Sequence, residues 1–214
     1  MTSIYIACAC NKVCMNPYVT NMLAWNLYEL GRVKIAVHPP ATYDDHPIHI
    51  ARNRAVEDFL TTQADYLFFY DSDIILHPMA ILKLLELKVP VASGWYIARK
   101  NKKPAVYVYA EPEKVPRYVR FPPPTIPKYR PLTIQEIVNT NKIKIHVDAV
   151  GAGCLLIRRD VFQKIKKPWF YFHPEGKYGE DLYFCYNARL AGYKIAVRPD
   201  VHCEHIHWIK LGVK

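Results

Sequence analysis

The run YLFFYDSDIIL restricts the fold of this chain more than any other segment. Apolar and aromatic residues fill 66–70, and Asp71-Ser72-Asp73 follows directly. An uninterrupted hydrophobic run of this kind is typical of a central strand that is buried on both faces of a parallel sheet. Residues two apart in an extended segment point the same way, so Asp71 and Asp73 would face one point beyond the carboxyl end of the sheet. The run therefore predicts an α/β fold with two carboxylates at its ligand-binding edge.

Strands and helices alternate through the first half of the chain, which is the pattern of parallel βαβ units. We expect strands over 3–9, 33–38 and 89–96, and helices over about 17–30, about 47–63 and about 78–87. After Lys142 the pattern predicts a strand pair broken at glycines, a short helix, a longer helix ending at Gly192 and a strand over about 194–198. These elements predict a mostly parallel central sheet flanked by helices.

The length of 214 residues suits one domain, and we assign residues 1–214 to it. A stretch from about 111 to 131 interrupts the pattern, with prolines at 112, 116, 122, 123, 124, 127 and 131. We expect no regular structure there, because proline fixes the backbone and removes a hydrogen-bond donor. Its aromatic and basic residues suit a lid or an acceptor-binding flap, and a poorly ordered linker is the alternative.

Composition limits the setting of the protein more than its activity. No stretch approaches the roughly 18 unbroken apolar residues of a membrane span, and the N-terminus lacks the features of a signal peptide, so we expect a cytoplasmic protein. Six cysteines without a CxxC pair predict buried free thiols rather than a zinc module or a disulfide framework.

The formal net charge of +10 favours anionic partners. Basic residues are spread along the chain, with one local cluster at Arg99, Lys100, Lys102 and Lys103. Because no nucleic-acid module is recognisable, we expect no nucleic-acid partner. The positive charge could also support peripheral contact with an anionic membrane. The alternative is that it only keeps the surface solvated.

Asp71 and Asp73 suggest a metal site. Carboxylates suit hard divalent cations such as Mg²⁺ or Mn²⁺, and such a cation would neutralise a diphosphate leaving group. A DxD pair by itself is a weak motif, since acidic pairs after strands often only cap helices or turns. Its place after YLFFY favours the metal site.

Two further segments carry candidate catalytic or metal-binding residues. Glu180 and Asp181 open a helix, where Asp181 could serve as a general base or the acids could only favour the helix dipole. In the tail VHCEHIH, His205 and His207 would share one face if the segment is extended. One of them could complete the shell of a metal, Zn²⁺ included, and a surface cluster without metal is the alternative.

Gly151 and Gly153 interrupt a strand pattern, which permits close approach of a ligand or of another backbone, or forms a β-bulge. Arg52 lies on the helix expected over about 47–63. It could contact the phosphates or ribose of a nucleotide, or lie on a solvated helix face. These residues alone do not choose between the two.

The order of these features is more specific than any one of them. RNRAVEDFL, ADYLFFYDSDIILHP, VDAVGAGCLLIRRDVF, GEDLYFCYNARLAGYKIAV and HCEHIH follow one another along the chain. In this order the sequence resembles the GT-A glycosyltransferases, in particular the family-2-like group. The resemblance covers about residues 3 to 207 without the proline-rich stretch. It implies a single Rossmann-like domain of the nucleotide-diphospho-sugar transferase type.

The resemblance also implies roles for the candidate residues. Asp71-Ser72-Asp73 would bind metal and donor, with Asp73 the direct metal ligand and Asp71 reaching the metal or the donor ribose. His205 would be a further metal ligand, and Asp181 would be the catalytic base with Glu180 as its substitute. Arg52 would help to hold the donor, and the segment from Gly151 to Gly153 would line the sugar or acceptor pocket.

The sequence thus predicts a glycosyltransferase that depends on Mn²⁺ or Mg²⁺. It would transfer a sugar from a nucleotide-diphosphate sugar to a saccharide, protein or lipid hydroxyl, with inversion. ACACNKVC after the first strand does not match the family's donor-binding turn, so the base-binding residues stay open, with Asp44 and Asp45 after the second strand as candidates. The alternatives are a nucleotidyltransferase acting on sugar phosphates, for which ACACNKVC lacks glycine, and a non-catalytic polyanion-binding protein.

Overall fold

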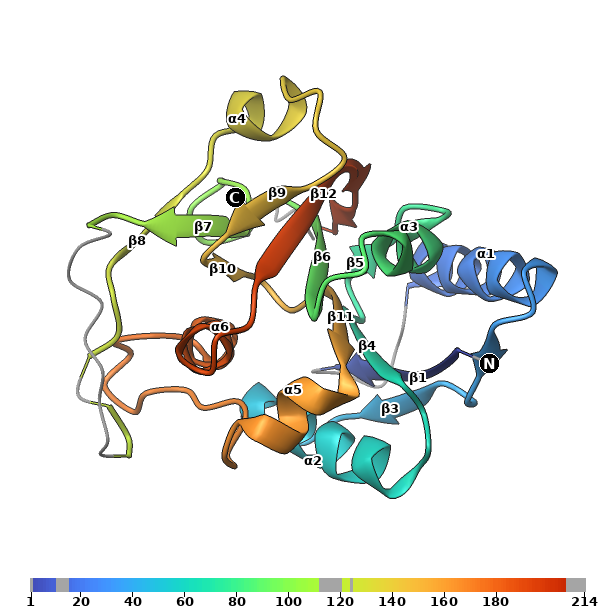
Figure 1. Cartoon of the computed structure of the whole chain (residues 1–214), viewed down its shortest axis with the longest axis horizontal. Coiled ribbons are helices and arrows are strands. Elements are labelled where there is room, and N and C mark those ends of the chain that lie inside the picture. The colour runs from blue at the N-terminus through green and yellow to red at the C-terminus, as the bar shows by residue number, and fades with distance from the viewer. Residues whose placement is uncertain (1, 11–15, 112–120, 124, 207–214) are drawn as a thin grey trace, which may run out of the picture.

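The computed structural model describes residues 2–10, 16–111, 121–123 and 125–206 (Figure 1). Its helices are α1 (Pro17–Arg32), α2 (Ile48–Thr61), α3 (Ala80–Glu86), α4 (Ile134–Val138), α5 (Arg159–Lys164) and α6 (Glu180–Leu190). Its strands are β1 (Ser3–Ala9), β2 (Ala36–Val37), β3 (Ala41–Tyr43), β4 (Tyr66–Asp71), β5 (Ile74–Ile75), β6 (Val91–Trp95), β7 (Val106–Tyr109), β8 (Tyr129–Pro131), β9 (Ile145–Val147), β10 (Ala149–Val150), β11 (Cys154–Arg158), β12 (Ile195–His202) and β13 (Glu204–His205).

The central sheet has the strand order β2-β1-β4-β11-β6-β12-β9, and β3 also pairs with β1. All of these strands run in one direction except β11 and β9, which are antiparallel to their neighbours. The predicted mostly parallel sheet flanked by helices is therefore confirmed. Two smaller sheets, β10-β7-β8 and β13-β5, lie beside it.

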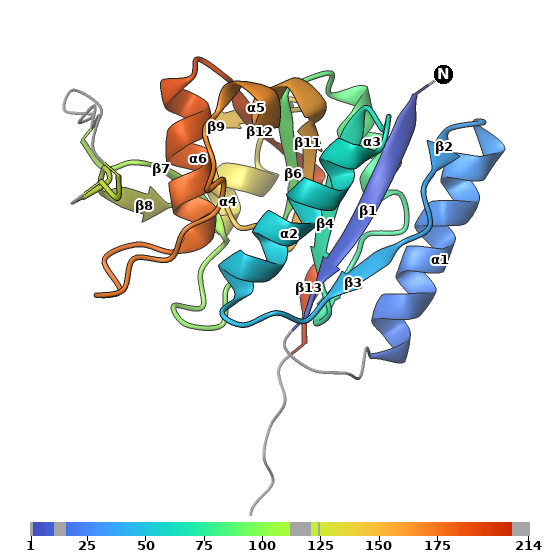
Figure 2. The same cartoon turned by 90° about the horizontal axis from the view of Figure 1, so that it is seen from below.

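The hydrophobic run forms β4, with β1 on one side and β11 on the other. Its side chains alternate between two apolar clusters. Leu67 and Phe69 pack with residues of α2, α5 and α6, whereas Phe68 and Tyr70 pack with residues of α1 and α3. Figure 2 shows α2 lying over β1 and β4 on the first of these faces. The prediction of a strand buried on both faces is confirmed.

Three expectations about local structure need correction. The strand expected over 33–38 is reduced to the two residues of β2, and β3 begins only after Pro39 and Pro40, which cannot donate to a ladder. The DSD segment is not extended: β4 ends at Asp71, and a turn carries Ser72 and Asp73 to β5.

The proline-rich stretch is also more regular at its end than expected. β8 pairs with β7, and its last residue, Pro131, is tolerated because β8 is an edge strand. Residues 112–120 and 124 of this stretch lie outside the described residues.

The remaining expectations concern thiols and membrane helices. Cys8, Cys10, Cys154, Cys185 and Cys203 are buried thiols that form no disulfide, as predicted, and Cys14 lies outside the described residues. Among the helices that the structure describes, none is long and apolar enough to cross a membrane.

Candidate functional site

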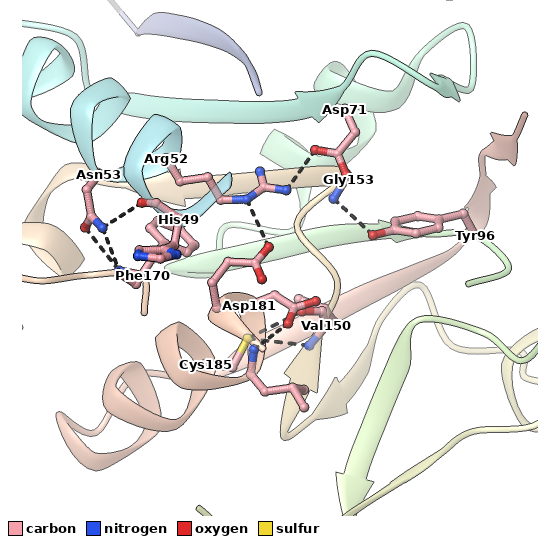
Figure 3. Close-up of polar contacts among 12 residues, drawn as sticks. His49, Arg52, Asn53, Asp71, Tyr96, Val150, Gly153, Phe170, Asp181 and Cys185 are labelled. Atoms are coloured by element: carbon pink, nitrogen blue, oxygen red, sulfur yellow. Dashed lines mark hydrogen bonds and ion pairs between the residues drawn. The ribbon is translucent and has the colours of Figure 1, made fainter. Parts of the chain in front are cut away.

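Arg52 lies at the centre of the candidate site, at the carboxyl end of β4. It is 2% exposed, so it does not lie on a solvated helix face. Its Nη2 donates to Asp71 Oδ1 at 2.8 Å, and its Nε lies 3.5 Å from Glu180 Oε1 (Figure 3). We call Arg52, Asp71 and Glu180 the buried triad. It ties the end of β4 to the first turn of α6, two segments that are distant in the sequence.

The surroundings of Arg52 keep its guanidinium charged. Burial alone would lower the pKa of Arg52, but the charges of Asp71 and Glu180 and the hydrogen bond to Asp71 raise it above its ordinary value. The guanidinium also faces the ring of Phe69, at 5.4 Å from its centroid. Its third nitrogen, Nη1, is buried and has no hydrogen-bond partner among the described residues. This leaves one buried donor free to bind an oxygen of a ligand.

Asp181 follows Glu180 in the first turn of α6. Its Oδ1 accepts a hydrogen bond from the backbone N–H of Leu182 at 2.8 Å. Burial, together with the nearby charge of Glu180, raises the pKa of Asp181 to about 7. A carboxylate with a pKa near neutrality is suited to take a proton from a hydroxyl group.

Tyr96 fills the space that the two glycines leave open. Its hydroxyl accepts a hydrogen bond from the backbone N–H of Gly153 at 3.2 Å. A Cβ atom placed on Gly151 would lie 2.3 Å from the Tyr96 hydroxyl, and one on Gly153 would lie 3.0 Å from Tyr96 Cζ. The close approach expected at the glycines is therefore made by an aromatic side chain. Burial raises the pKa of Tyr96 well above its ordinary value, so it stays neutral.

Asp73 lies in the turn after β4 and belongs to a second group of charges. Its carboxylate accepts a hydrogen bond from Arg99, and His205 Nε2 lies 3.6 Å from its Oδ1. We call Asp73, Arg99 and His205 the outer triad. Burial pushes the pKa of Asp73 up, but the hydrogen bond of His205 and the charge of Arg99 outweigh it and hold this pKa below its ordinary value.

The tautomer of His205 follows from its other nitrogen. Nδ1 lies 2.9 Å from the backbone carbonyl of Ile97. A carbonyl only accepts, so Nδ1 carries a hydrogen, and Nε2 then donates to Asp73 when His205 is protonated and offers its lone pair to a cation when the ring is neutral. Two lone-pair donors that face each other in this way are suited to hold a cation between them. A backbone carbonyl that accepts from the other ring nitrogen is also common where a histidine binds a metal.

Asp73 and His205 are spaced suitably for one divalent cation. Two ligands that each lie about 2.1 Å from one ion are about 3 Å apart, which is close to the 3.6 Å between His205 and Asp73. Asp71, by contrast, is turned toward Arg52. Across the described part of the chain, no three His, Cys, Asp or Glu side chains form a metal cluster. Asp73 and His205 thus face each other as one carboxylate and one imidazole, a pair that suits an ion which takes further ligands from phosphate oxygens, and Asp71 as a third ligand stays a prediction.

The other predicted residues lie nearby or are occupied elsewhere. Ser72 is half-buried in the turn between β4 and β5. His202 stacks on Trp95 with ring centroids 4.2 Å apart, and His207 lies outside the described residues. Tyr96 was not among the predicted site residues, and Arg99 was predicted only as part of a basic cluster. No signal local to Arg99 indicated its contact with Asp73.

Comparison with solved structures gives the fold a context. The chain is similar to A197 from STIV, with 16% identity and a TM-score of 0.58 over 97% of this chain and 87% of that one. It is also similar to GalNAc-T7, crystallised with UDP, GalNAc and Mn²⁺, with 13% identity and a TM-score of 0.53 over 98% of this chain and 44% of that one. For TarS from S. aureus the identity is 16% and the TM-score 0.50, over 97% of this chain and 37% of that one.

These similarities confirm the predicted GT-A-like fold, and at such identities they concern the fold alone. No protein-family model and no curated protein sequence matches the chain. This chain spans most of A197 but less than half of the other two proteins.

Proposed function

We propose that the protein is a glycosyltransferase that uses a nucleotide-diphosphate sugar together with a divalent cation. The observation that carries this proposal is the buried triad, because Arg52 joins the carboxylate at the end of β4 to the helix that begins with Glu180 and Asp181. Asp71, which would face the donor, and Asp181, the proposed base, thereby belong to one site at the carboxyl end of the sheet, where α/β folds bind ligands. The GT-A-like fold supports this assignment.

Each residue of the site would have its own role in the reaction. Asp73 and His205 would hold the cation, and a cation bound there would neutralise charge on the departing diphosphate. Arg52 would neutralise Asp71 and offer its free Nη1 to an oxygen of the donor. The base would be Asp181, whose pKa of about 7 keeps a large fraction ionised at neutral pH.

The reaction would be a single displacement. Asp181 would take the proton of an acceptor hydroxyl as its oxygen attacks the anomeric carbon. The bond from that carbon to the diphosphate oxygen breaks at the same time, and the electron pair leaves with the nucleoside diphosphate. One displacement inverts the configuration at the anomeric carbon. The acceptor would be a saccharide, a protein or a lipid with a free hydroxyl group.

The test is the hydrolysis or transfer of nucleotide sugars, with UDP-sugars first because GalNAc-T7 was crystallised with UDP. We expect release of UDP that requires Mn²⁺ or Mg²⁺, with the anomer of the first-formed product identified by NMR. Release of pyrophosphate from a nucleoside triphosphate and a sugar phosphate would support the nucleotidyltransferase instead. Absence of both reactions, with tight binding to anionic polymers, would favour a non-catalytic protein.

A further inference from the structure

The connection from β6 to β7, residues 96–105, carries the basic cluster of the sequence; we call it the basic loop. Its backbone is closed by hydrogen bonds from Ala98 N–H to Lys103 O at 2.8 Å and from Ala105 N–H to Tyr96 O at 2.9 Å. Its basic side chains are all exposed: Arg99, Lys100, Lys102 and Lys103. A loop with a fixed backbone thus presents several positive charges to solvent.

The basic loop contacts both residues of the proposed cation site. The carbonyl of Ile97 accepts the hydrogen of His205 Nδ1. Two positions further on, Arg99 Nη2 donates to the carboxylate of Asp73 and, at 3.1 Å, to the carbonyl of Ile206. The loop therefore orients one prospective ligand through its backbone and covers the other with a positive charge.

We infer that Arg99 is a ligand of the donor phosphates. Asp73 holds Arg99 until a divalent cation takes the place of Arg99 at Asp73. The diphosphate of the donor then binds the released guanidinium. This inference rests on the proposed function, because it requires a donor that carries a diphosphate. The cation and Arg99 need the same carboxylate, so binding of one weakens binding of the other. A diphosphate offers the released guanidinium several anionic oxygens in a geometry that suits its paired donors.

The ion pair between Arg99 and Asp73 is exposed, so breaking it should cost little free energy. The side chain of Arg99 is 45% exposed and that of Asp73 is 30% exposed. Ion pairs at such positions contribute little to stability, because water and salt compete for both partners. Arg99 can therefore leave Asp73 without disturbing the core. Cation and nucleotide should bind cooperatively, because the cation releases Arg99 for the diphosphate and the nucleotide releases Asp73 for the cation.

Removal of the Arg99 side chain should change the two affinities in opposite directions. In Arg99→Ala, Mn²⁺ should bind the nucleotide-free protein about threefold more tightly, because one exposed ion pair no longer competes for Asp73. UDP should bind the Mn²⁺-saturated protein about tenfold more weakly, because a charge-assisted contact to phosphate is lost.

The experiment measures Mn²⁺ binding by electron paramagnetic resonance and UDP binding by calorimetry at saturating Mn²⁺. The matched control is Lys100→Ala, which removes the same charge from the same loop, and none of the described contacts joins Lys100 to Asp73. The melting temperature of each variant checks that it is folded. Opposite shifts in Arg99→Ala, with clearly smaller shifts in Lys100→Ala, would support the inference.

Three results would overturn the inference. Equal affinity shifts in both variants would show that the overall positive charge of the basic loop, and not the contact between Arg99 and Asp73, causes them. An Mn²⁺ affinity that Arg99→Ala leaves unchanged or lowers would remove the competition. If the wild-type protein bound Mn²⁺ but neither UDP nor GDP, the proposed function itself would fail, and the inference with it.

Discussion

The buried triad and the outer triad of the candidate site contain similar charges in different surroundings. In the buried triad the side chains of Arg52, Asp71 and Glu180 are 2%, 21% and 14% exposed. In the outer triad, Arg99 and Asp73 are 45% and 30% exposed, and His205 is 13% exposed. Charges withdrawn from water need their internal partners, whereas exposed charges can exchange partners with solvent and ligands. One half of the site is therefore a fixed framework, and the other half can be remodelled when a ligand binds.

The largest effect is expected beside the buried triad. Asp181→Asn should lower kcat by roughly 10²–10⁴-fold while donor affinity stays close to that of the wild type, because the variant loses the base but keeps the charges around it. Steady-state kinetics and calorimetry measure the two quantities. Normal turnover in this variant would exclude Asp181 as the base.

The pH profile adds a second readout for the same residue. Because the pKa of Asp181 is raised to about 7, its proton is lost only near neutrality. The rate of the wild-type enzyme should therefore increase with pH up to about 7 and then level off, and this rise should be absent from the residual activity of Asp181→Asn. A rate that is already constant above pH 5 would place the base elsewhere.

The next effect tests whether the buried triad is a framework. Arg52→Met should lower the free energy of unfolding by about 3–5 kcal/mol, because Asp71 and Glu180 would lose their counterion. Arg54→Met is the control on the same helix: Arg54 is 62% exposed and lies 3.4 Å from Asp45, so we expect a change of less than about 0.5 kcal/mol. Urea unfolding of both variants measures the difference. Similar changes in both would contradict the proposed role of Arg52 as a structural bridge.

A smaller effect is expected at the glycines. Gly151→Ala should cost about 1–3 kcal/mol, because its Cβ would lie 2.3 Å from the Tyr96 hydroxyl and the ring must shift. Gly31→Ala is the control, since a Cβ there meets nothing within 4 Å and alanine is the better helix former, by roughly 0.5–1 kcal/mol. Thermal unfolding compares the two. A neutral Gly151→Ala would show that the Tyr96 ring moves freely.

The smallest effect on folding is expected in the outer triad. Arg99→Ala should change the free energy of unfolding by less than about 1 kcal/mol, as is usual for an exposed ion pair. Urea unfolding in low and high salt measures this change. A loss comparable to that of Arg52→Met would remove the distinction between the two triads.

The fold could be predicted from the sequence because its signals are local. The apolar run at 66–70 and the helix signals around it depend on neighbouring residues, and β4, α1, α2 and α6 lie where they were expected. The turn at Ser72 and Asp73 was missed, because a turn between two apolar segments looks the same as a continuous strand in a hydrophobic pattern. β5 begins directly after it and pairs with β13 from the far end of the chain.

The candidate site could be predicted only in part, because its contacts join distant segments. Arg52 bonds with residues 19 and 128 positions away, and Arg99 bonds with a residue 26 positions away. One signal for Arg52 was present: it continues the i, i+3, i+4 and i+7 series of the buried residues Ala55, Val56 and Phe59. A charge in such a series indicates a buried ion pair, since unpaired charges are rarely buried.

A thermal-shift panel of UDP, GDP, CMP and dTDP sugars with and without Mn²⁺, on the wild-type protein and on Asp73→Ala, tests the proposed donor and cation site. A donor site that includes a cation at Asp73 and His205 predicts stabilisation by one nucleotide class only when Mn²⁺ is present. This stabilisation should disappear in Asp73→Ala. Stabilisation that is independent of Mn²⁺ and unchanged in Asp73→Ala, or no stabilisation by any nucleotide sugar, would contradict the account.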